Sequence, residues 1–120
     1  GDGCFAMNGF EVATAAAEHI PIVLFVFNDR RLGMVEHGHR TVYGREASYP
    51  IQMDVGSLAH GLGAAFYRVD RPGQLVALRD HLRASTGPVV VDVLIDPDVR
   101  MPTRDRMITI DATRTIKMVN

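Results

Sequence analysis

The sequence has little of several features that would point directly to a function. It contains one cysteine, Cys4, which excludes an internal disulfide and favours a reducing, cytoplasmic location. Thirteen basic and fourteen acidic residues are interspersed, and the net charge of −1 argues against nucleic acid as a partner. The longest apolar run, Ile20 to Phe27, has eight residues, whereas a membrane-spanning helix needs about 20. No charged-then-apolar leader is visible, so no signal peptide is predicted.

What the sequence does contain is an alternation of helical and strand patterns in a chain of 120 residues, 47% of them apolar. Residues 22–27 are apolar without alternation, which predicts a strand buried on both faces at the centre of a parallel sheet. Two further strands are predicted over 65–69 and 89–95, and helices over 6–19, from Leu32, over 55–61 and after Pro72. This order predicts an α/β fold, a parallel sheet with helices on both faces in a three-layer sandwich, incomplete at its N-terminus.

The segments between these elements carry local signals. Asp54 is expected to cap the helix over 55–61, and Leu75, Leu78 and Leu82 to mark the buried face of the helix after Pro72. Residues 38–53 are expected to be irregular. We expect residues 1–98 to form one domain and residues 99–120 to be a C-terminal tail.

The chemistry-bearing residues follow strand ends. Asn28-Asp29 comes directly after the strand over 22–27, and Gly1-Asp2-Gly3 precedes a helix, where a strand just upstream of residue 1 is expected. Ligands of parallel sheets bind beyond the carboxyl ends of the strands, so Asp2 and Asp29 are predicted to meet there. Two hard carboxylate ligands beside flexible glycines and a helix N-terminus favour Mg²⁺ or Ca²⁺ with a phosphate group.

This pattern resembles the signature of the thiamine-diphosphate-dependent enzymes, in which Gly-Asp-Gly is followed after a similar gap by Asn-Asn. The resemblance is to the acetolactate synthase group, covers residues 1–98, and implies the C-terminal diphosphate-binding domain of such an enzyme. The stretches that carry it include Gly1-Asp2-Gly3-Cys4-Phe5-Ala6-Met7-Asn8, Asn28-Asp29-Arg30-Arg31-Leu32-Gly33-Met34-Val35, and Gly87-Pro88-Val89-Val90-Val91-Asp92-Val93.

The resemblance implies a role for each matching position. Asp2 and Asp29 would ligate Mg²⁺ through their side chains, and Arg31 through its backbone carbonyl, which leaves the Arg31 side chain without a role. The residues implied to contact thiamine diphosphate are Gly1, Asp2, Gly3, Cys4, Asp29, Gly33 and Met34. None of these residues is catalytic, because the glutamate that activates the cofactor comes from a separate domain, usually of a second subunit in a homodimer or homotetramer.

The implied reaction is decarboxylation of a 2-oxo acid, followed by carboligation to an acceptor carbonyl or by protonation, the work of a transferase or a lyase. Two positions depart from the pattern. Asp29 replaces the second Asn, and its extra charge would repel the diphosphate unless Arg30 or Arg31 compensates. Gly38 stands where acetolactate synthases carry a Trp that shapes the acceptor pocket, which leaves room for a different substrate. A simple 2-oxo acid decarboxylase and a non-catalytic homologous domain therefore stay as alternatives.

Other candidates in the same region have two interpretations each. Glu36 is either a catalytic carboxylate or, as we favour, a solvated or loop-facing one. His37 and His39 are either acid–base groups near neutral pH or, more commonly for such positions, surface residues. A Rossmann-like nucleotide site is disfavoured because no Gly-x-Gly-x-x-Gly follows a strand.

Overall fold

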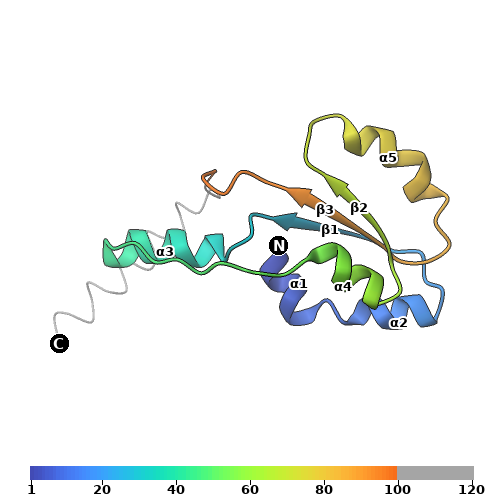
Figure 1. The fold of residues 1–120 in the computed structure, drawn as a ribbon, viewed down its shortest axis with the longest axis horizontal. Coiled ribbons are helices and arrows are strands. Elements are labelled where there is room, and N and C mark those ends of the chain that lie inside the picture. Colours follow the sequence, from blue (N-terminus) through green and yellow to red (C-terminus); the bar gives the residue numbers. More distant parts are fainter. Residues whose placement is uncertain (100–120) are drawn as a thin grey trace, which may run out of the picture.

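The computed structural model describes residues 1–99, which form a parallel sheet with helices on both faces (Figure 1). Its strands are β1 (Val23–Asn28), β2 (Ala65–Val69) and β3 (Val89–Leu94), arranged in the order β1-β3-β2. Val89 of β3 lies opposite Val23 on one side and Ala65 on the other. The predicted α/β fold with helices on both faces is confirmed.

The helices divide between the two faces of the sheet (Figure 1). On one face lie α1 (Asp2–Asn8), α2 (Glu11–Ala17) and α4 (Val55–Gly61), and on the other lies α5 (Gln74–Arg83). Successive side chains of β3 alternate between them. Val90 joins the larger core with Phe5, Val12, Val26, Val55, Ala59 and Ala64, whereas Val89 and Val91 pack with Val69, Leu78 and Leu82 under α5.

The strand predicted to be central is an edge strand of the described sheet. β3 occupies the centre, and its first three valines are at most 1% exposed, whereas Phe25 and Phe27 of β1 are 44% and 53% exposed. Both strands are mainly apolar, so their composition predicts burial but does not show which strand is central. Leu75, expected on the buried face of α5, is also 42% exposed. It lines a shallow apolar groove between α5 and β1 together with Phe25.

The single helix predicted over 6–19 is in fact two helices, α1 and α2. The break falls at Gly9, whose amide donates to the Phe5 carbonyl at 2.7 Å and whose backbone packs so tightly that a Cβ would lie 2.5 Å from the Phe5 ring. The alanines of this region predict helix, but they do not show where the chain must turn. The first helix also begins earlier than expected, so Asp2 and Gly3 lie in its first turn.

The segment predicted to be irregular over 38–53 is partly helical. α3 (Gly33–Tyr43) extends through its first part and ends at Gly44, which takes the left-handed φ of 63°. Residues 44–53 then return beside the start of α3, where the Leu32 amide donates to Tyr49 O and the Ile51 amide to Arg30 O, both at 2.8 Å. α3 therefore projects beyond the carboxyl end of β1 (Figure 1).

The remaining predicted elements lie close to their expected positions. The strand over 65–69 and the helix over 55–61 have the expected bounds, and the Asp54 side chain caps α4 by accepting from the Ser57 amide at 2.6 Å. The predicted tail, 99–120, lies outside the described residues except for Val99. Within the described part of the chain, no helix is long and apolar enough to cross a membrane.

Candidate functional site

Asp2 presents a buried carboxylate oxygen that is not satisfied by any described group. The residue is 3% exposed, its Oδ1 accepts the Gly3 amide at 2.9 Å, and its Oδ2 has no hydrogen-bond partner. Burial raises the pKa of Asp2 above its ordinary value; the Gly3 amide opposes this, and the nearby charge of Asp29 adds to it. Because buried oxygens in folded proteins are nearly always paired, the arrangement favours a cation at Oδ2.

Asn28 connects the end of β1 to the centre of the sheet. Its Nδ2 donates to Oδ1 of Asp92 at 2.9 Å, and its own Oδ1 accepts the Arg30 amide at 3.0 Å. Asp92 is fully buried in β3 and also accepts from Nε of Arg68 on β2 at 3.1 Å. One buried carboxylate therefore ties all three strands together and fixes the turn that follows β1.

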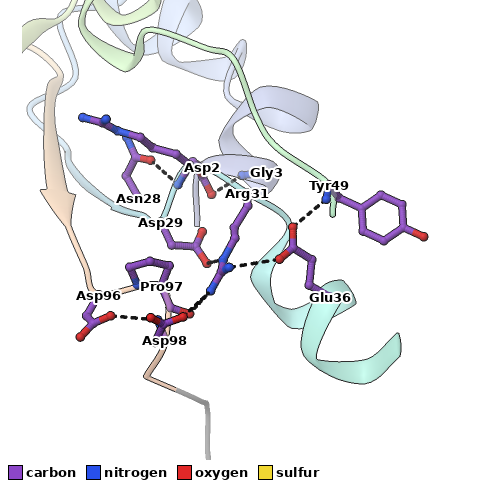
Figure 2. A network of polar contacts seen from close by, with 11 residues as sticks. Asp2, Gly3, Asn28, Asp29, Arg31, Glu36, Tyr49, Asp96, Pro97 and Asp98 are labelled. Carbon is purple, nitrogen blue, oxygen red and sulfur yellow. Dashed lines mark hydrogen bonds and ion pairs between the residues drawn. The ribbon is translucent and has the colours of Figure 1, made fainter. Parts of the chain in front are cut away.

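That turn carries Asp29 to the neighbourhood of Asp2. Arg30 adopts a left-handed φ of 59°, which non-glycine residues seldom take and which is concentrated at functional sites. The Asp29 carboxylate packs directly against the backbone of Gly33, where a Cβ would lie 2.1 Å from Oδ2. The charge of Asp29 acts on Asp2, and both side chains belong to the network drawn in Figure 2. A side chain at position 33 would therefore displace the Asp29 carboxylate.

The Arg31 side chain contacts several charged groups, although the family resemblance implies a role only for the Arg31 backbone carbonyl. Its Nε lies 3.9 Å from Asp29 Oδ2, its Nη1 3.2 Å from Glu36 Oε2, and its Nη2 3.5 Å from Asp98 Oδ1 (Figure 2). Nη2 also donates to the Pro97 carbonyl. The guanidinium therefore joins the turn after β1, the first part of α3 and the segment after β3.

Glu36 faces the returning loop, which is one of the environments expected for it. Its Oε1 accepts the Tyr49 amide at 2.6 Å, and the side chain is only 10% exposed. It is therefore not solvated. With Arg31 and His37 it lines a polar cavity of about 170 Å³ beside α3. His39 instead packs against the rings of Tyr43 and Tyr49, with centroid distances of 4.8 and 5.8 Å.

The other predicted cofactor residues are divided between packed and exposed positions. Gly1 lies next to the Phe27 carbonyl at the end of β1, and Gly3 is pressed against the Leu32 side chain, which a Cβ would approach to 2.6 Å. Cys4 is exposed, and Met34 is 57% exposed. The structure therefore gathers Gly1, Asp2, Gly3, Asp29, Arg31 and Gly33 at one end of the sheet and leaves the Cys4 and Met34 side chains on the surface.

The donor set suits a hard cation that is only partly held by protein. No group of three or more His, Cys, Asp or Glu side chains in residues 1–99 could hold a metal by itself. Mg²⁺ is usually bound through one or two carboxylates, with phosphate and water oxygens completing its octahedron. Asp2, with an unpaired buried oxygen, and Asp29 beside it provide that number of carboxylates.

Comparison with known families identifies the family of this chain. Residues 1–93 match the family described as thiamine pyrophosphate enzyme, C-terminal TPP binding domain, where TPP is thiamine diphosphate. The chain belongs to this family.

Comparison with individual proteins shows which members of this family the chain is similar to. The chain is 37% identical over 106 residues to the putative acetolactate synthase large subunit IlvB2 of Mycobacterium tuberculosis, and this covers 85% of the chain and 19% of that protein. It is 32% identical over 105 residues to a probable acetolactate synthase large subunit of Methanocaldococcus jannaschii (85% and 18% covered). It is 36% identical over 98 residues to an acetolactate synthase of Bacillus subtilis (80% and 17% covered). The chain is thus a TPP-binding domain of the acetolactate synthase-like kind and spans less than a fifth of these relatives.

Sequence reasoning missed the residues that support the site. Asp92 had a visible signal, since it is the one charged residue in the apolar run from Val89 to Ile95, and a buried charge requires partners. Asn28 was identified only as part of the Asn28-Asp29 motif, without a structural role of its own. The contacts of Arg31 with Pro97 and Asp98 join segments 66 and 67 positions apart, and no local pattern reports such contacts.

Proposed function

We propose that residues 1–98 form the part of a thiamine-diphosphate- and Mg²⁺-dependent enzyme that holds the diphosphate of the cofactor. The observation that carries this proposal is the buried, unpaired Oδ2 of Asp2 beside the Asp29 carboxylate. Asp2 and Asp29 bind the cation through their side chains and Arg31 through its backbone carbonyl. The remaining contacts to the cofactor come from Gly1, Gly3, Cys4, Gly33 and Met34.

The proposed substrate is a 2-oxo acid, which is decarboxylated and then joined to an acceptor carbonyl or released as an aldehyde in the cytoplasm. Thiamine diphosphate, when bound, supplies the carbon nucleophile and the electron sink for this chemistry. The residues of this chain bind and orient it. The activating glutamate comes from a different domain, of a second subunit in a homodimer or homotetramer, so the 120-residue chain alone is expected to have no turnover.

The packing around Gly38 supports keeping simple decarboxylation as a second candidate. A Cβ at this position of α3 would meet nothing within 4 Å, so no described residue fills the space next to Gly38. Incubating the full-length protein with pyruvate, thiamine diphosphate and Mg²⁺ separates the two reactions. Accumulation of a 2-hydroxy-2-methyl-3-oxo acid identifies carboligation, and accumulation of free acetaldehyde identifies simple decarboxylation.

Cofactor binding itself is tested by calorimetry on the full-length protein with thiamine diphosphate and Mg²⁺. We expect saturable binding that requires the cation and is lost in Asp2→Ala. Asp80→Asn is a matched control, because Asp80 is 86% exposed on α5 and pairs with its neighbour Arg79. Absence of binding heat in the wild-type protein, together with unchanged activity in Asp2→Ala, would instead identify a non-catalytic homologous domain.

A further inference from the structure

The guanidinium of Arg31 is held beside Asp29 by groups other than Asp29. Glu36 Oε2 lies 3.2 Å from Nη1, and the Pro97 carbonyl accepts from Nη2, so two oxygens outside Asp29 contact the group. Glu36 is itself fixed by the Tyr49 amide at 2.6 Å and is 10% exposed. Asp98 is 91% exposed, and an ion pair with so exposed a partner adds little. The position of Arg31 is therefore built into the structure.

The contact of Arg31 with Asp29 is electrostatic and not a hydrogen bond. Nε lies 3.9 Å from Asp29 Oδ2, which exceeds hydrogen-bond range, and Nε is buried without a hydrogen-bond partner. The two side chains are 25% and 16% exposed, so their charges are only partly screened by water. Among residues 1–99, Arg31 is the only basic side chain within ion-pair distance of Asp29.

We propose that Arg31 is the counter-charge that allows an aspartate at position 29 to face a diphosphate. Asp2 and Asp29 together place two negative charges where an anion must also bind, and the charge on Arg31 offsets one of them. Arg31 acts here through its side chain, as a positioning and charge-balancing residue, and does not react. The inference rests on the proposed binding of thiamine diphosphate at this site.

The proposal predicts effects of opposite sign on the two ligands. Arg31→Gln removes the charge and leaves a shorter, neutral polar side chain, so thiamine diphosphate at saturating Mg²⁺ should bind about tenfold more weakly, a change of ~1.4 kcal/mol. Mn²⁺ without cofactor, a probe measured by electron paramagnetic resonance, should bind more tightly, because the cation meets a more negative site. A purely structural role for Arg31 would weaken both.

Rescue provides the decisive comparison in the full-length protein. Asp29→Asn together with Arg31→Gln removes one charge of each sign. The double variant should therefore bind thiamine diphosphate with an affinity within about threefold of wild type. Arg31→Lys should retain it, and Arg40→Gln is the control, since Arg40 is an arginine of α3 that pairs with Glu46 at 2.6 Å.

Failure of the double variant to recover affinity would overturn the proposal, as would equal losses in Arg31→Lys and Arg31→Gln. If Arg31→Gln does not fold, Asp29→Asn alone decides. It leaves Arg31 in excess and should bind thiamine diphosphate at least as tightly as wild type, so weaker binding would overturn the proposal. Absence of cofactor binding in the wild-type protein would refute the proposed function, a result distinct from all of these.

Discussion

Asn28 donates from Nδ2 to the fully buried Oδ1 of Asp92 at 2.9 Å, across 64 positions of sequence. The same amide group accepts the Arg30 backbone N–H through its oxygen at 3.0 Å. The turn that carries Asp29 is therefore attached to the central strand through one side chain. Rigid support of this kind keeps a binding residue in position before its ligand arrives.

We expect Asn28→Ala to loosen β3 and the turn together. It leaves Asp92 Oδ1 without the Asn28 donor and the Arg30 amide without its acceptor, and an unsatisfied buried polar group costs about 1–3 kcal/mol. Hydrogen-exchange mass spectrometry on the full-length protein would measure this as faster exchange in peptides covering 89–94. Asp80→Asn, on the exposed pair of α5, is the control. Unchanged protection of β3 would show that the Asn28 contact contributes nothing.

Two glycines of α3 provide a matched pair of substitutions. Gly33→Ala would place a Cβ 2.1 Å from Asp29 Oδ2, so the carboxylate must move, and thiamine diphosphate binding should weaken tenfold or more, that is, by at least ~1.4 kcal/mol. Gly38→Ala meets nothing within 4 Å and should instead stabilise the helix by about 0.5–1 kcal/mol. Calorimetric titration and the thermal midpoint of each variant measure the two effects. Equal cofactor affinities in the two variants would contradict a role for Asp29.

The elements with strong local signals were predictable from the sequence. The capped helix over 55–61 and the strand over 65–69 depend on Asp54, on flanking turns and on apolar periodicity, all of which are local. The break at Gly9 was missed because the surrounding alanines favour helix, whereas the turn depends on the Phe5 ring packed against the glycine. Strand order was missed because the runs 22–27 and 89–95 are both strongly apolar.

The site was predictable in its motifs and not in its support. Gly1-Asp2-Gly3 and Asn28-Asp29 follow recognisable spacing, and the parallel sheet explains why they lie at one edge. The contacts that fix them are long-range, as with Asn28 to Asp92 and Arg31 to Pro97, and depend on register between strands distant in sequence. A family resemblance predicts which positions bind the ligand. It does not predict the charged groups that surround Asp29 in this particular chain.

The cap of α4 should respond to pH in a defined direction. The backbone and side-chain groups of Ser57 hold the pKa of Asp54 below its ordinary value, so its ionised form is favoured in the folded state. Its contribution is therefore present at neutral pH and is lost as pH falls through the lowered folded pKa, below the usual carboxyl value of about 4.

Asp54→Asn tests this directly, because asparagine caps helices as well as ionised aspartate does but does not titrate. Exchange of the Ser57 amide should match between wild type and this variant at neutral pH and diverge only in acid, where the wild type is less protected. Asp54→Ala should be less protected at every pH. A wild-type profile that is flat into acid would show that the carboxylate charge is irrelevant to the cap.

Asp2→Asn should affect the free and liganded proteins in opposite directions. Burial raises the pKa of Asp2 when the site is empty, so the folded state binds a proton more readily than the unfolded chain. The sign of this linkage means that stability falls as pH rises from the unfolded value to the raised folded value, and that the penalty persists at neutral pH. Removing the charge should therefore raise the thermal midpoint of the cofactor-free protein at pH 7 but not in acid.

With thiamine diphosphate and Mg²⁺ at about 100 times their dissociation constant, the wild-type protein should gain about 2.7 kcal/mol of stability, whereas Asp2→Asn should gain little. Thermal unfolding of both proteins at several pH values measures both effects: the higher midpoint of Asp2→Asn without ligands and its smaller gain in stability with them. Glu18→Gln, at an exposed position after α2, is the control and should behave as wild type. If Asp2→Asn is stabilised by the ligands as strongly as wild type, the unpaired Oδ2 of Asp2 is not the cation ligand.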